Sequence, residues 1–169
     1  MVIWLIGLSG SGKSTIAKIL YEKIKKKYPN TVWLDGDEVR KIYNDKLGYT
    51  LSDREKNAER LSKISKFLSD QKINVISSVL SNFPRWQKWN KKKINNYKQI
   101  YVKVSLENLI LRDRKNLYKK ALNKKKKNVV GVDIKFHEPL KSDLIIDNNI
   151  KTKNFNKIVR KILKFTKNY

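Results

Sequence analysis

The chain has 169 residues, with 40 lysines and arginines against 15 acidic residues and a formal net charge of +25. This length suits one domain with a sizeable core, so we predict a single domain over residues 1–169. The absence of cysteine excludes disulfides and thiolate chemistry. Because no apolar run reaches 18 residues and no signal peptide precedes the first strand, we expect a cytoplasmic protein without a membrane partner.

The first predicted elements are a buried strand over residues 2–6 and a helix that begins at about Lys13, joined by a glycine-rich loop. The loop matches the phosphate-binding pattern, in which two glycines with four residues between them precede Lys and then Ser or Thr. Glycines allow positive φ angles and let backbone N–H groups approach phosphate oxygens, while Lys13 supplies charge and the Ser14 hydroxyl can ligate Mg²⁺. The residues predicted to bind nucleotide phosphates are Gly7, Leu8, Ser9, Gly10, Ser11, Gly12, Lys13, Ser14 and Thr15.

Strands and helices alternate along the rest of the chain, which favours a parallel sheet covered by helices on both faces. Ser52 is predicted to cap one helix, with Glu55 completing a capping box. The pattern predicts an α/β fold of the P-loop NTPase type, with three α/β/α layers and a mainly parallel five-stranded sheet. Further strands are expected at 31–34, 73–78, 99–104 and 143–147, and further helices include 38–46 and 154–166.

Two carboxylates follow the second predicted strand, where ligands bind in parallel sheets. Asp35 and Asp37 flank Gly36, and Arg40 lies one helical turn further on. Beside a phosphate loop, one carboxylate could order the water shell of Mg²⁺ while the other accepts a proton from an attacking alcohol. A polar turn with a helix cap is the structural alternative.

These motifs, together with several later ones, resemble the adenylylsulfate kinase family over residues 2–147. The later motifs are Leu47-Gly48-Tyr49, Asp53-Arg54 with Asn57, Arg112-Asp113, Leu117-Tyr118-Lys119-Lys120-Ala121 and Gly131-Val132-Asp133. The resemblance implies a kinase that uses ATP and Mg²⁺ to phosphorylate the ribose 3′-hydroxyl of a small-molecule nucleotide acceptor.

The resemblance also implies roles for individual residues. Lys13, Asp35 and Asp37 would be catalytic, and Ser14 and Asp35 would serve the metal. Arg112 would lie beside the adenine of ATP, and residues from about 112 to 135 would form a lid. The acceptor would be bound by Arg40, Tyr49, Arg54, Asn57, Ser81, Lys119 and Lys120. Ser81 aligns with a serine sometimes assigned as a phosphoserine intermediate, but direct in-line transfer needs no covalent step.

Two departures from the family pattern lie where the acceptor's base would bind. Val129 stands where the family has a stacking Phe, and Asn82 stands where it has Pro, while Tyr49 keeps the other aromatic. A lost stacking partner weakens base binding by roughly 1–3 kcal/mol. A pyrimidine needs less stacking area than adenine. The resembled family includes relatives whose acceptor is cytidine diphosphoramidate, used in capsule phosphoramidate synthesis, so the resemblance implies this acceptor as the expected one. The alternative is adenylylsulfate, the acceptor of sulfate assimilation.

The high positive charge suggests a second class of function, a basic nucleic-acid-binding P-loop protein. Only seven of the 40 basic residues are Arg, and the lysine runs at 25–27, 91–93 and 124–127 are most simply solvated surface. We therefore predict no specific nucleic-acid partner, while a homodimer stays open. A nucleotide sensor without chemistry is disfavoured by Lys13, Ser14 and the two aspartates.

Overall fold

A computed structural model describes residues 1–43, 47–113, 116–139, 141–150 and 154–167. A five-stranded sheet, all of whose paired strands are parallel, has the order β2-β3-β1-β4-β5. The strands are β1 (Val2–Ile6), β2 (Thr31–Asp35), β3 (Asn74–Val79), β4 (Tyr97–Lys103) and β5 (Leu144–Asp147). The helices are α1 (Lys13–Lys27), α2 (Gly36–Ile42), α3 (Leu51–Asp70), α4 (Pro84–Lys93), α5 (Leu106–Leu111), α6 (Leu117–Leu122) and α7 (Phe155–Lys167).

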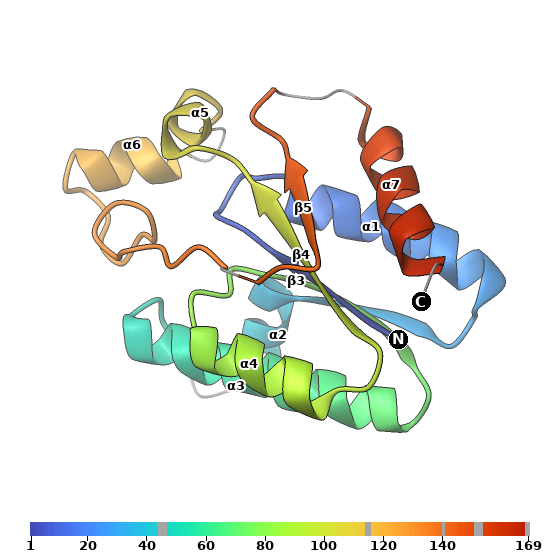
Figure 1. The fold of residues 1–169 in the computed structure, drawn as a ribbon. Coiled ribbons are helices and arrows are strands. Elements are labelled where there is room, and N and C mark those ends of the chain that lie inside the picture. The colour runs from blue at the N-terminus through green and yellow to red at the C-terminus, as the bar shows by residue number, and fades with distance from the viewer. Residues whose placement is uncertain (44–46, 114–115, 140, 151–153, 168–169) are drawn as a thin grey trace.

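The sheet lies between two layers of helices, as the sequence predicts. Figure 1 shows α1 and α7 on one face and α2, α3 and α4 on the other. Alternate residues of a strand point to opposite faces, so the fully buried β1 serves both cores. Ile3 and Leu5 pack with α1 and α7, while Val2 and Trp4 pack with α3 and α4. The predicted three-layer α/β/α fold is confirmed.

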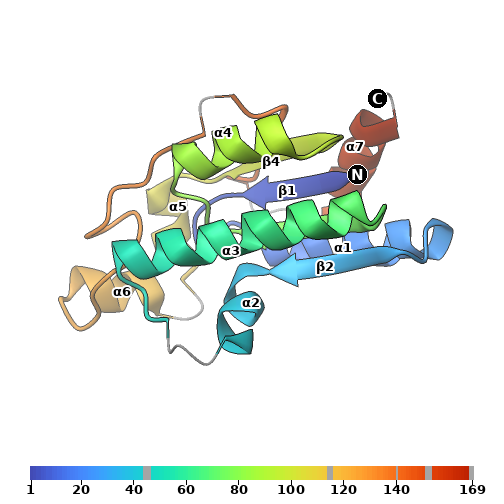
Figure 2. The ribbon, with the colours of Figure 1, turned by 90° about the horizontal axis from the view of Figure 1, so that it is seen from below.

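The carboxyl ends of the strands point toward α5 and α6, and in Figure 2 the loops after β1 and β2 lie at this same end. Each of these strands is followed by a polar loop or a helix start, because the apolar run that forms the strand ends there. Residues that are far apart in the sequence therefore meet at one edge of the sheet.

Some predicted boundaries differ from the structure. Thr50, not Ser52, caps α3: its hydroxyl accepts a hydrogen bond from Asp53 N at 3.2 Å, and the Asp53 carboxylate accepts one from Thr50 N at 3.1 Å. Asp at the third helical position thus completes the box in place of Glu55. Helix α2 begins at Gly36, earlier than the predicted residue 38, because the Asp35 side chain caps it. The helix ends at Ile42, earlier than the predicted end at about Lys46, because the backbone of Tyr43 is already extended.

The lysine runs at 25–27, 91–93 and 124–127 are exposed, as predicted. Two of them occupy the last turns of α1 and α4, where cations complement the negative end of the helix dipole. These lysines therefore have a structural role at helix ends, which accounts for part of the positive charge without a nucleic-acid partner. Of the helices that the structure describes, none combines the length and apolar character that crossing a membrane requires.

Candidate active site

The loop between β1 and α1 has the geometry of an anion cradle. A Cβ at Gly7 would lie 2.5 Å from the carbonyl oxygen of Val102, so only glycine allows this close approach to β4. Gly12 has a φ of +98° and caps α1, whose N-terminal N–H groups face the loop. Such an N-terminus attracts negative charge. The geometry of the loop therefore suits phosphate groups, as the sequence predicts.

Lys13 lies at the centre of this cradle and is 8% exposed. Its Nζ donates a hydrogen bond to the carbonyl oxygen of Leu8 at 2.7 Å. Burial lowers the pKa of Lys13 to about 8, and the nearby charges of Asp35 and Asp37 oppose this shift. Among the described residues the ammonium has only this neutral hydrogen-bond acceptor, so a phosphate anion bound beside it would stabilise the charged form of Lys13.

The phosphate loop is fixed by residues that the sequence reasoning did not assign. The Asn148 Nδ2 donates to Ser11 O at 2.9 Å, and the Tyr118 hydroxyl donates to Ser9 O at 2.8 Å. Both side chains are buried, at the end of β5 and on α6. Arg112 donates to the carbonyl oxygens of Asn148, at 2.7 Å, and of Asn149. Arg112 thus lies close to the phosphate loop, and its predicted contact with adenine stays a prediction.

Asp35, at the end of β2, faces the first turn of α1. Its carboxylate accepts hydrogen bonds from Ser14 Oγ at 2.9 Å, from Ser78 Oγ at 2.8 Å and from Asp37 N at 3.0 Å. A hydroxyl and a carboxylate are hard oxygen ligands, and Mg²⁺ is typically held by one or two such groups together with phosphates and waters. In the described residues there is no group of three acidic or histidine side chains that could hold a metal alone. Ser14 and Asp35 therefore fit a nucleotide-bound Mg²⁺.

Asp37 lies in the first turn of α2 and differs from Asp35 in its surroundings. Its side chain is exposed and accepts no hydrogen bond from any residue that the structure describes. Its charge acts on Lys13 and Arg54. Of the two predicted catalytic carboxylates, Asp37 is thus the one free to contact a ligand.

Two guanidinium groups surround the ring of Tyr49. The Cζ of Arg40 lies 4.8 Å from the ring centroid and the Cζ of Arg54 lies 5.3 Å from it. Arg40 donates to Gly48 O, and Arg54 donates to Tyr49 O at 2.9 Å and to Asn128 O at 2.7 Å. Burial, and then the charge of Arg40, lower the pKa of Arg54. Among the described residues these two like charges bond to carbonyl oxygens only, an arrangement that suits an anion.

Several buried polar atoms beside these arginines lack a partner in the described part of the chain. They are Arg40 Nε, Asn57 Oδ1 and Ser81 Oγ, and all three belong to residues predicted to bind the acceptor. The other end of the Asn57 amide donates to Gly36 O at 3.0 Å, which ties α3 to the turn between Asp35 and Asp37. Unpaired buried atoms also occur elsewhere in the described residues, at Trp4 and Asn90 for example, so these three are compatible with a polar ligand but do not by themselves locate one.

The remaining predicted positions are less closely joined to this cluster. Lys119 and Lys120 are exposed on α6 and donate no hydrogen bond to another candidate residue among those described. Val129 is 2% exposed and packs inward with Leu8 and Tyr118. Asn82 is also buried, where it accepts from His137 N at 2.7 Å and donates to Lys135 O at 2.8 Å. Asn82 therefore fastens the loop before β5 to the end of β3.

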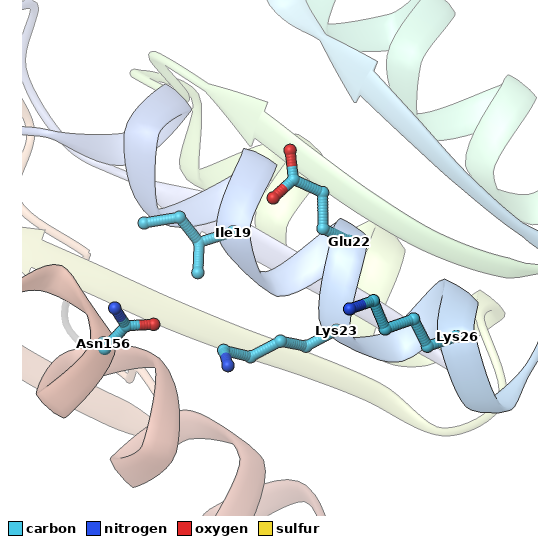
Figure 3. Close-up of a pocket in the computed structure, with 5 residues that line it drawn as sticks. All are labelled: Ile19, Glu22, Lys23, Lys26 and Asn156. Atoms are coloured by element: carbon cyan, nitrogen blue, oxygen red, sulfur yellow. The ribbon is translucent and has the colours of Figure 1, made fainter.

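Trp86 and Trp89 both belong to α4 and take part in packing. Trp86 is buried with Ala58 and Phe83, and the two indole rings meet edge to face with centroids 5.7 Å apart. A separate surface pocket lies between α1 and α7 (Figure 3) and is lined by Ile19, Glu22, Lys23, Lys26 and Asn156. None of these is a predicted site residue, and the pocket lies along the outer helices rather than at the carboxyl ends of the strands.

Comparison with known proteins agrees with this geometry. Residues 1–147 match the family model described as adenylylsulphate kinase. The chain is 45% identical over 166 residues to the cytidine diphosphoramidate kinase of Campylobacter jejuni, covering 96% of this chain and 94% of that protein. It is 36% identical over 148 residues to the adenylyl-sulfate kinase of Oceanobacillus iheyensis, covering 86% and 74%.

Solved structures give the same result. The APS kinase CysC of Mycobacterium tuberculosis, solved in complex with AMPPNP and APS, is 25% identical with a TM-score of 0.84 and covers 98% of this chain and 96% of its own. Shikimate kinase from Aquifex aeolicus, 21% identical with a TM-score of 0.60 over 99% of this chain and 97% of its own, shares the fold. The chain therefore belongs to the adenylylsulfate kinase family, and it is a nucleotide kinase, a phosphotransferase that uses ATP and has an alcohol group as acceptor.

Proposed function

We propose that the protein transfers the γ-phosphoryl group of ATP to the ribose 3′-hydroxyl of cytidine diphosphoramidate. The observation that carries the choice of acceptor is the higher identity, over nearly the whole chain, to a cytidine diphosphoramidate kinase than to an adenylyl-sulfate kinase. Adenylylsulfate is the alternative acceptor within the same family.

The phosphate cradle and Asp37 supply the parts of an in-line transfer. The backbone N–H groups at the start of α1, with Lys13, hold the β- and γ-phosphates and stabilise the charge that develops on them. Asp37 accepts the proton of the 3′-hydroxyl as its oxygen bonds to the γ-phosphorus. The bond between that phosphorus and the β–γ bridging oxygen breaks, and ADP leaves. No covalent intermediate on Ser81 is required.

Mg²⁺ would be held by Ser14 and ordered by Asp35, and when bound it would neutralise negative charge on the phosphates. This division of labour follows from the hydrogen bonds. The lone pairs of Asp35 are already engaged by Ser14, Ser78 and Asp37 N, whereas the Asp37 carboxylate has no such partner among the described residues. Asp37 is therefore the base in this proposal.

The acceptor's diphosphate end fits the anion site of Arg40 and Arg54, because guanidinium groups bind phosphate oxygens in a bidentate manner. Its base would stack on Tyr49, whose side chain is 48% exposed. Val129 is buried in its own cluster and offers no second aromatic face. One aromatic ring with polar neighbours suits a pyrimidine better than the larger adenine.

The acceptor is tested by measuring kcat/KM for cytidine diphosphoramidate and for adenylylsulfate with saturating MgATP. We expect the cytidine acceptor to be preferred by about tenfold or more, because one lost stacking face costs a purine roughly that much in affinity. Cytidine diphosphate, which lacks the terminal amide, is the matched control for the 5′ substituent. A preference for adenylylsulfate would refute the choice of acceptor while leaving the kinase assignment intact.

A further inference from the structure

A chain of hydrogen bonds runs from the edge of the sheet to the phosphate loop. The indole Nε1 of Trp33 donates to Ser78 Oγ at 3.0 Å, and Ser78 Oγ donates to Asp35 Oδ2 at 2.8 Å. The same carboxylate oxygen accepts from Ser14 Oγ at 2.9 Å. Ser78 is 3% exposed, so water does not compete for its hydroxyl. Neither Trp33 nor Ser78 belongs to the residues assigned to binding or catalysis above.

The register of the sheet creates this alignment. Asp35 pairs with Ser78 across β2 and β3, and Trp33 stands two residues before Asp35 on the same strand. Residues two apart in a strand share a face, so Trp33 and Asp35 both lie on the face that α1 covers. Trp33 packs against this core, with its ring 6.5 Å from that of Tyr21. The indole is thereby held in place on one side by packing.

The donors and acceptors in this chain allow only one direction for the hydroxyl hydrogens. An indole N–H can only donate, and an ionised carboxylate can only accept. Ser78 must therefore receive a hydrogen from Trp33 and give its own to Asp35. Ser14 likewise gives its hydrogen to Asp35, which leaves the Ser14 oxygen lone pairs free. A hydroxyl oxygen in that state is a ligand for a cation rather than a donor toward a phosphate.

We propose that Trp33 and Ser78 are positioning residues that hold the Asp35 carboxylate in the orientation in which it presents Ser14 Oγ to the cation of MgATP. The inference rests on the proposed function, since it concerns how the same site receives its metal-bound nucleotide. Neither residue touches the substrate. Ser78 bonds to Asp35 directly, whereas Trp33 bonds to Ser78. The effects of replacing Trp33 and Ser78 on Mg²⁺-dependent ATP binding should therefore not be additive.

Calorimetric titration tests this by measuring the dissociation constant of ATP in EDTA and in Mg²⁺. The first constant divided by the second gives the gain in affinity from Mg²⁺, and this ratio does not depend on turnover. We expect Ser78→Ala to reduce this ratio about tenfold and Trp33→Phe, which keeps a ring but loses the N–H, to reduce it about threefold. The double variant should equal Ser78→Ala alone, because among the described residues the Trp33 N–H donates only to Ser78, and Trp33→Phe keeps the packing of the ring. In turnover, both should lower kcat at limiting Mg²⁺ while the KM for the acceptor stays unchanged.

The controls are Ser77→Ala and Trp86→Phe. Ser77 is the buried neighbour that bonds instead to Ser65 Oγ, at 3.2 Å, and the Trp86 indole N–H is buried without a partner in the described residues. Both controls should keep the wild-type ratio. If the wild type shows no stronger binding with Mg²⁺, the proposed function fails. If the wild type does and Ser78→Ala keeps the same ratio, or if the two effects simply add, only this inference is overturned.

Discussion

The nucleotide side and the acceptor side of the site are built in different ways. On the nucleotide side, hydrogen bonds within the protein hold the loop: Lys13 bonds to Leu8 O, Ser14 to Asp35 and Asn148 to Ser11 O. Two nucleotide-side atoms, Ser11 Oγ and Asn148 Oδ1, are buried without a partner in the described residues. On the acceptor side, Arg40 Nε, Asn57 Oδ1 and Ser81 Oγ are buried without partners in the described part of the chain. The cradle is thus tied together by several hydrogen bonds between distant parts of the fold, whereas the arginines on the predicted acceptor side bond to carbonyl oxygens that a ligand could replace.

This difference indicates where chemistry and specificity are decided. Preorganised charges stabilise a transition state without reorganising during the reaction, so changes in the cradle should lower kcat. Arginines that are bonded to carbonyl oxygens must exchange those partners for the acceptor, so changes there should alter acceptor KM.

Lys13→Ala should give the largest loss, about two to three powers of ten in kcat, because it removes the charge beside the transferred phosphoryl group. Lys18→Ala, an exposed residue on the same helix, is the control. Steady-state kinetics with saturating MgATP measure both. A Lys13→Ala enzyme with nearly normal turnover would mean that phosphoryl transfer does not use this loop.

Replacing the two aspartates separately should distinguish a base from a metal-ordering group. Asp37→Asn keeps the shape but cannot accept a proton, so kcat should fall by about a hundredfold or more with little change in MgATP affinity. Asp35→Asn should lower kcat and also raise the Mg²⁺ concentration needed for half-maximal rate.

The exposed Glu38, which is ion-paired with Lys41, provides the control variant Glu38→Gln. If both Asn variants remain fully active, the proton leaves the ribose by another route and the assigned roles are wrong. If Asp35→Asn alone abolishes turnover, the two roles are exchanged.

Arg54→Ala probes the acceptor side. We expect the acceptor KM to rise about tenfold to a hundredfold, since a charged hydrogen-bond donor is lost, while the KM for MgATP stays near the wild-type value. Arg85→Ala, whose guanidinium lies over Trp86 on α4, is the control. A selective rise in the KM for MgATP would place Arg54 on the nucleotide side and break the contrast.

A smaller effect should appear as proton uptake. In the free protein burial lowers the pKa of Lys13 to about 8, so near that pH a fraction of the molecules lacks the proton. Bound phosphates favour the charged form and raise this pKa, so ATP binding at pH 8 should take up a fraction of a proton, and less at pH 6.5. Calorimetry in buffers of different ionisation enthalpy measures it. Proton release at pH 8 would contradict this environment for Lys13.

Local sequence patterns were enough to predict the sheet and the phosphate loop. A short apolar run gives β1, and the glycine spacing before Lys13 specifies the turn into α1, because both depend on neighbouring residues. The cap of α3 was misplaced by two residues, since Thr50 and Ser52 offer the same hydroxyl and only the chain path decides between them.

The hydrogen bonds that hold the phosphate loop in place could not be predicted from local patterns. Tyr118 and Ser9 are 109 residues apart in the chain, and Asn148 and Ser11 are 137 apart. Their pairing depends on the tertiary fold rather than on any local pattern. The sequence does hint at the hydrogen bonds around Asp35, because the consecutive serines 77 and 78 in a buried strand need hydrogen-bond partners. The inward packing of Val129 had no such signal, because an apolar residue in a loop fits either surface or core.

The central claim is that the ribose 3′-hydroxyl receives the phosphoryl group, and phosphorus NMR of the reaction product tests it most directly. The purified protein would be incubated with MgATP and cytidine diphosphoramidate. We expect stoichiometric ADP and a new phosphomonoester whose phosphorus couples to the ribose H3′, and with Lys13→Ala this product should form about a hundredfold or more slowly. A phosphate on the terminal group of the diphosphate chain, or inorganic phosphate alone, would contradict it.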